Sequence, residues 1–199
     1  MRGGWRRSMG VVLLSGAAAA PLHAAQGTAP LSEADRNLVV DMARANLGEI
    51  EAARMAQVKT KNPQVKQFAQ RMIAEHGKAL EDMRQLAQSK GVSLPATADS
   101  QHRKLGQSLN ALSGAAFDRR YVAQSGVDDH KRAHALLLRV QTQAEDADVK
   151  ALAAKMLPVV DQHLHAIEQL SATIAHGTTS GTSGTAGASG GGERPPRAH

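Results

Sequence analysis

Four stretches of this 199-residue sequence repeat apolar residues at alternating intervals of four and three, and each repeat is interrupted near its middle by a polar side chain. Such spacing places the apolar residues on one face of a helix, whereas a half-buried strand needs strict alternation. No segment of the sequence alternates in that way. The pattern therefore predicts an all-α protein whose four helices bury their apolar faces against one another.

Residues that start and stop helices set the expected boundaries. Ser32 and Asn62 are good N-caps, Pro63 suits a first helical position, and Lys90-Gly91 is typical of a helix end. Asp146 or Asp148 can cap the last helix. We expect long helices over 33–60, 63–90, 115–144 and 148–175, and a short extra helix within 97–112, in the crossover between the second and third.

Composition excludes several classes of protein. Cysteine is absent, which excludes disulfides, thiolate metal sites and cysteine nucleophiles. Arg2, Arg6 and Arg7 supply three of the six net positive charges, and the C-terminal tail supplies one, so the body carries only two. With only 2% aromatic residues there is no stacking platform, and we expect no binding to nucleic acid.

Both ends of the chain differ from its body. Residues 1–25 combine a basic start, a short apolar run at 11–20 and small residues at Ala24-Ala25, the layout of a cleavable signal peptide. The apolar run is too short to span a membrane, and no second run of spanning length follows, so we expect no transmembrane span in the mature protein. Residues 177–199 are rich in Gly, Ser and Thr and predict a disordered tail, leaving 31–175 as the folded bundle.

The polar interruptions of the four apolar faces carry the functional signal. They are Glu49, His76, His130 and His163, each near the midpoint of its expected helix. In a bundle with aligned ends, residues at mid-helix reach one level whichever way the helices run. We therefore expect one carboxylate and three imidazoles to meet inside the core.

Two interpretations of this layer stay open. Nitrogen and oxygen donors of this kind suit a divalent transition metal (Zn, Fe, Mn or Cu). The same groups could instead form a purely structural layer of hydrogen bonds, because buried polar groups without partners are costly. A metal-dependent enzyme would also need an open coordination position and a pocket beside the layer.

Other polar residues are weaker candidates. His134 lies one turn from His130 and is either a further metal-site residue or a partly exposed histidine. Glu75 points away from the apolar face and is expected at its rim, and His102 in the crossover is expected to be solvated. Four methionines are expected to fill the core rather than bind copper: Met42, Met72, Met83 and Met156.

The chain also resembles a known family. Its segments EIEAARMAQVKTKNPQVKQFAQRMIAEHGKAL, LSGAAFDRRYVAQSGVDDHKRAHALL and VKALAAKMLPVVDQHLHAIEQL are similar to those of the bacterial exported proteins called the domain of unknown function 4142 family. The resemblance covers about residues 33–170 and includes all four polar interruptions. It implies a ferritin-like antiparallel four-helix bundle in a periplasmic or secreted protein, without an assigned activity. Where the family usually has Asp-His, this chain has Glu75-His76, and the paired Glu-x-x-His motifs of di-iron ferritins are missing.

The sequence thus predicts a metal-binding bundle for metal buffering or stress protection. The alternative is a non-catalytic structural or interaction protein of the cell envelope.

Overall fold

The computed structural model describes residues 30–179, which are helical with no strand anywhere in that range. Helix α1 spans Glu33–Lys59, α2 spans Pro63–Ser89, and α6 spans Ala147–Thr179. The helix expected over 115–144 follows a continuous helical path that comprises α4 (Gly114–Arg120), the π-helix η1 (Tyr121–Asp128) and α5 (Asp129–Gln143). Helix α3 (Ser100–Asn110) is the short helix expected in the crossover. The all-helical prediction is confirmed.

Side-chain caps begin the helices where the sequence predicts them. The Ser32 hydroxyl accepts the backbone N–H of Asp35, and the Asn62 side chain accepts N–H groups at the start of α2. Of the two candidate caps for the last helix, Asp146 is the one used, since its carboxylate accepts the N–H groups of Asp148 and Val149. These contacts satisfy donors that a helix start otherwise leaves unpaired.

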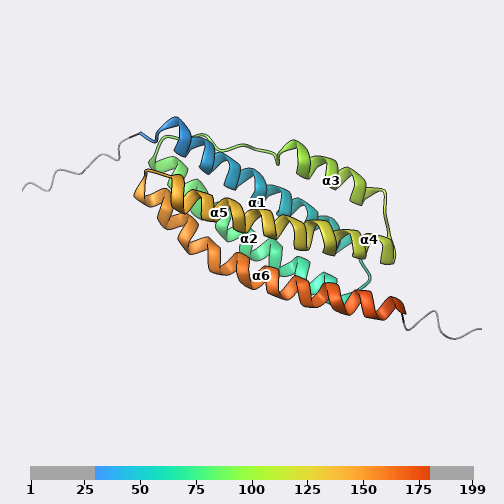
Figure 1. Cartoon of the computed structure of the whole chain (residues 1–199). Coiled ribbons are helices and arrows are strands. Elements are labelled where there is room, and N and C mark those ends of the chain that lie inside the picture. The colour runs from blue at the N-terminus through green and yellow to red at the C-terminus, as the bar shows by residue number, and fades with distance from the viewer. Residues whose placement is uncertain (1–29, 180–199) are drawn as a thin grey trace, which may run out of the picture.

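The long helices lie side by side, α1 against α2 and α5 against α6, with α3 packed outside against α1 (Figure 1). Their apolar side chains form two separate clusters. One contains Met42, Met83, Leu137 and Val160, and the other contains Met72, Phe117, Tyr121 and Ile167. On each of the four helical paths, the expected polar interruption falls between residues of these two clusters.

A regular α-helix over 115–144 would place Ala116 and Ala123 on the buried face that carries His130, and this expectation is wrong. Ala116 and Ala123 are exposed, whereas Phe117 and Tyr121 are buried and stack on one another. The cause is the π-helix, in which the N–H group of Asp129 reaches the carbonyl of Gln124, five residues back. Because a π-helix has more residues per turn than an α-helix, the residues before η1 face a different direction, relative to those after it, than they would in a regular α-helix.

The two ends lie mostly outside the described residues. The expected signal peptide at 1–25 falls there, as does most of the expected tail, although α6 continues to Thr179, three residues into that tail. Among the described helices, none is long and apolar enough to cross a membrane.

Candidate metal centre

The structure brings the four polar interruptions together between the two apolar clusters. His76 from α2, His130 from α5 and His163 from α6 each offer one ligand atom, and these atoms lie within 4.8 Å of one another. Glu49 from α1 joins them, because its Oε2 atom is 2.8 Å from Nε2 of His76 and 3.4 Å from Nε2 of His130. All four side chains are at most 5% exposed. Three buried histidines in this arrangement could hold a metal ion.

The atoms that face one another at the centre lack hydrogen-bond partners. In the described part of the chain, six buried side-chain atoms have none, and four of these are Glu49 Oε2, His76 Nε2, His130 Nε2 and His163 Nδ1. Glu49 Oε2 and His76 Nε2 are nevertheless close enough for an ion pair. Burying four polar atoms without hydrogen bonds is costly, and a common partner at the centre would satisfy all of them.

The other nitrogen of each imidazole does have a partner. His76 Nδ1 is 2.8 Å from Oδ1 of Asn46, whose amide in turn donates to the carbonyl of His76. His130 Nδ1 donates to the carbonyl of Gly126 at 2.7 Å, and His163 Nε2 bonds to the carboxylate of Glu75. A histidine that ligates a metal through one nitrogen typically donates from the other to such an oxygen, which fixes its tautomer and orientation.

The pKa values of two of these residues are displaced from their ordinary values. Burial raises the pKa of Glu49, but the neighbouring imidazoles of His130 and His76 outweigh burial and lower it to about 2. Burial lowers the pKa of His163 to about 4, against the opposing effect of its bond to Glu75. Both shifts favour the state that coordinates a cation, an ionised carboxylate and a neutral imidazole.

The family follows from comparison with known proteins. The profile of the family described as "Domain of unknown function (DUF4142)" matches residues 20–170. The chain belongs to the DUF4142 family. Its four central residues all lie within the matched region, and no curated protein sequence matches the chain.

Two solved structures share the fold of this DUF4142 protein. A DUF305 fragment from Deinococcus radiodurans has a TM-score of 0.64 and 14% identity, over 72% of this chain and 99% of the fragment. A candidate spore coat protein from Bacillus halodurans C-125 has a TM-score of 0.58 and 16% identity, over 85% of this chain and 96% of its own. At this level of identity the likeness shows a common helical fold alone.

Local backbone structure positions His130 in the DUF4142 chain. Gly126 lies in the π-helix one turn before it, and its carbonyl accepts the imidazole proton. The chain needs glycine there, because a Cβ atom would lie 2.4 Å from Cγ1 of Ile167 on α6. The close approach of η1 and α6 thus places His130 and His163 opposite each other, with ring centroids 5.3 Å apart. π-Helical turns are frequent at functional sites for this reason.

The weaker candidates fall outside the centre, with one exception. His134 is half-buried and pairs with Asp161 at 3.3 Å between α5 and α6. Met42, Met72 and Met83 are buried in the core as expected, and Met156 is partly buried. The exception is Glu75, which lies at the rim as predicted but reaches inward to orient His163.

The prediction that His102 is solvated is wrong. Its side chain is 10% exposed and lies between Asp99, at 2.7 Å, and Asp129, at 3.6 Å. It occupies the space left by Gly48 on α1, where a Cβ atom would lie 2.3 Å from the imidazole. Gly48 in the middle of a long helix was the sequence signal for this contact, since glycine there costs helix stability without a packing reason.

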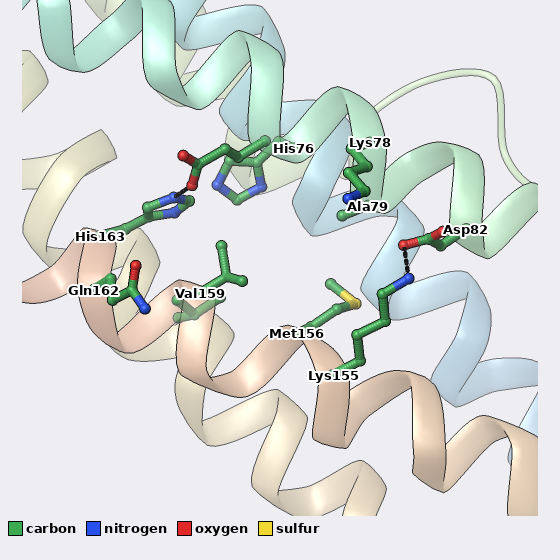
Figure 2. A pocket seen from close by; sticks show the side chains of 11 residues that line it. His76, Lys78, Ala79, Asp82, Lys155, Met156, Val159, Gln162 and His163 are labelled. Atoms are coloured by element: carbon green, nitrogen blue, oxygen red, sulfur yellow. Dashed lines mark hydrogen bonds and ion pairs between the residues drawn. The ribbon is translucent and has the colours of Figure 1, made fainter.

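A pocket opens beside the centre between α2 and α6 (Figure 2). Its volume is about 360 Å³, and His76 and His163 lie at one end of it. A second, much smaller cavity of about 20 Å³ touches Glu49 and His76. His130 lines neither of these two spaces. The centre is thus approached through two of its histidines.

Proposed function

We propose that this protein is an exported metal-binding protein in which Glu49, His76, His130 and His163 hold one divalent transition metal inside a ferritin-like antiparallel four-helix bundle. The observation that carries the proposal is the set of four buried, converging ligand atoms without hydrogen-bond partners. A purely structural polar layer would be expected to pair all four atoms with one another. Here Glu49 Oε2 lies at ion-pair distance from His76 and His130, but Nδ1 of His163 has no hydrogen-bond partner, and the hydrogen bonds of the three imidazoles are made by their other nitrogens.

The donor set narrows the metal. Three imidazole nitrogens and one carboxylate oxygen suit Zn²⁺, Fe²⁺, Mn²⁺ or Cu²⁺, and such a site follows the usual order of affinities, with Cu²⁺ strongest. One carboxylate and three imidazoles supply enough ligands for one ion only, which favours a mononuclear site. Storage or buffering of a metal, as protection against metal stress, is the function that such a site supports best.

Metal content tests the site directly. The full chain, stripped with a chelator and dialysed against Zn²⁺, is expected to hold one ion per chain by elemental analysis. The double variant His76→Ala/His163→Ala is expected to hold none, because two of four ligands are removed. The matched control His134→Ala/His165→Ala, on exposed or half-buried histidines, is expected to retain one ion. Equal loading of both double variants would contradict the proposed site.

The surrounding bonds give a finer prediction. Glu75→Gln removes the charge that orients His163, and Asn46→Ala removes the partner of His76. Each is expected to weaken Zn²⁺ binding about 10- to 100-fold without changing the stoichiometry at saturation. Competition with a chromogenic chelator measures this change. Unaltered affinity in both variants would show that these bonds are structural only.

Export is the second part of the proposal and rests on the sequence of residues 1–25. We expect the mature chain to begin near Ala25 or Gln26 in the periplasmic or secreted fraction. Mass spectrometry of the N-terminal peptide from fractionated cells measures this. An intact segment from Arg2 to Ala20 on cytoplasmic protein would contradict export while leaving the metal site untouched.

A further inference from the structure

We infer that the pocket between α2 and α6 is a binding site for a small monoanion, a short-chain carboxylate, whose carboxylate completes the coordination of the metal. The inference rests on the proposed metal site and adds an exogenous ligand to it. Three features carry it: the position of the pocket, the charge balance of the centre, and the chemistry of the pocket walls.

The pocket reaches the centre at a place that the Glu49 carboxylate does not occupy. Glu49 contacts His76 and His130, and neither Glu49 nor His130 lines the pocket. The buried imidazoles of His76 and His163 form its inner end (Figure 2). A ligand in the pocket would therefore reach the metal from the side of these two histidines.

The charge of the loaded centre calls for an anion. A divalent ion bound by Glu49 and three neutral imidazoles keeps one net positive charge, and the Glu75 carboxylate bonded to His163 offsets it from outside the ligand set. Together the four charged residues around the pocket do not cancel it, because they include two cations, Lys78 and Lys155, and two carboxylates, Glu75 and Asp82. Lys155 already pairs with Asp82 at 2.7 Å, and Glu75 with His163. Lys78 is then the remaining cation of the lining, and a monoanion at the inner end of the pocket would balance the net positive charge of the loaded centre and its lining together.

The walls of the pocket favour a short apolar chain behind the charged group. Between the histidines and the Lys155–Asp82 pair lie Ala79 on α2 and Met156 and Val159 on α6 (Figure 2). Val160 and Gln162 also line the pocket. At about 360 Å³ the pocket lies at the small end of the range of ligand sites. A carboxylate of a few carbons fits this combination, with its charged group at the histidines and its chain along the apolar wall.

Co²⁺ provides the test, since its visible absorption reports changes in coordination. The Co²⁺-loaded full chain is titrated with butyrate, acetate and butylammonium. Butyrate is expected to change the spectrum saturably and to bind about tenfold more tightly than acetate, because two further methylenes contact the apolar wall. Butylammonium, with the same chain and the opposite charge, is expected to cause no change.

Three variants assign the effect to the pocket. Val159→Trp fills it and is expected to abolish the response, whereas Val58→Trp, on a residue that is 85% exposed, is expected to leave it intact. Lys78→Glu is expected to weaken butyrate binding about three- to tenfold at low salt. Because Lys78 is exposed, this variant tests the pocket even if Val159→Trp disturbs folding.

The outcomes separate the two proposals. A chain that holds no Co²⁺ contradicts the proposed function and the ligand site together. A chain that holds Co²⁺ with a spectrum unchanged by butyrate, or one in which Val159→Trp and Lys78→Glu both respond like the wild type, contradicts the ligand site alone.

Discussion

Adding Zn²⁺ to the metal-free chain is expected to raise its melting temperature by roughly 10 °C. A ligand that binds only the folded state at a thousandfold excess over its Kd stabilises that state by about 4 kcal/mol. For a domain of this size, each kcal/mol corresponds to about 2–4 °C. The metal would also be a shared partner for four buried atoms that lack hydrogen bonds. These atoms are Glu49 Oε2, His76 Nε2, His130 Nε2 and His163 Nδ1.

Differential scanning calorimetry without Zn²⁺ and with free Zn²⁺ at about a thousandfold excess over its Kd measures the shift. His76→Ala removes a ligand and is expected to reduce the shift to less than about 3 °C. The control His165→Ala changes an exposed histidine on the same helix as His163 and is expected to keep the full shift. A wild-type chain that gains nothing from Zn²⁺, Mn²⁺, Fe²⁺ or Cu²⁺ would favour the alternative, a structural polar layer that fixes the register of the helices.

The centre was largely predictable because its residues break an otherwise apolar pattern. A histidine or glutamate that interrupts a 4/3 repeat must lie on the buried face of its helix. Its position near the middle of the helix then gives its height along the bundle axis to within a turn or two, whichever way the helix runs. Glu49, His76, His130 and His163 satisfied both conditions, and the structure places them within contact distance.

The partners of these residues were harder to predict, for physical reasons specific to each. Asn46 is buried one turn before Glu49, and its role depends on the amide reaching across to α2, which no spacing within α1 reveals. Glu75 reaches His163 from the rim because its side chain is long enough to turn inward. The sequence of η1 has no capping residue or proline that would indicate a π-helix. The side of the helix on which Ala116 and Ala123 lie could therefore not be predicted.

The pKa shifts of His163 and Glu49 predict how the stability of the metal-free chain depends on pH. His163 has a folded pKa of about 4 against an ordinary value of 6.5, so the unfolded state binds its proton first as the pH falls. Its contribution is therefore fully present above pH 6.5 and is lost between pH 6.5 and 4. Glu49 has a folded pKa of about 2 against 4.5, so its contribution is lost between pH 4.5 and 2.

The loss that belongs to His163 falls above pH 4, where the carboxylates remain mostly ionised. We expect the free energy of unfolding to fall by up to about 3 kcal/mol between pH 7 and 4. Urea unfolding of the chelator-treated chain at steps of half a pH unit measures this. His163→Gln, which cannot take up a proton, is expected to flatten the curve over this range, whereas His165→Gln is expected to keep its slope because that histidine is exposed. An equal slope in wild type and His163→Gln would show that acid sensitivity arises elsewhere. Bound metal competes with the proton for His163, so loading with Zn²⁺ should move the loss to lower pH in the wild type and leave His163→Gln less changed.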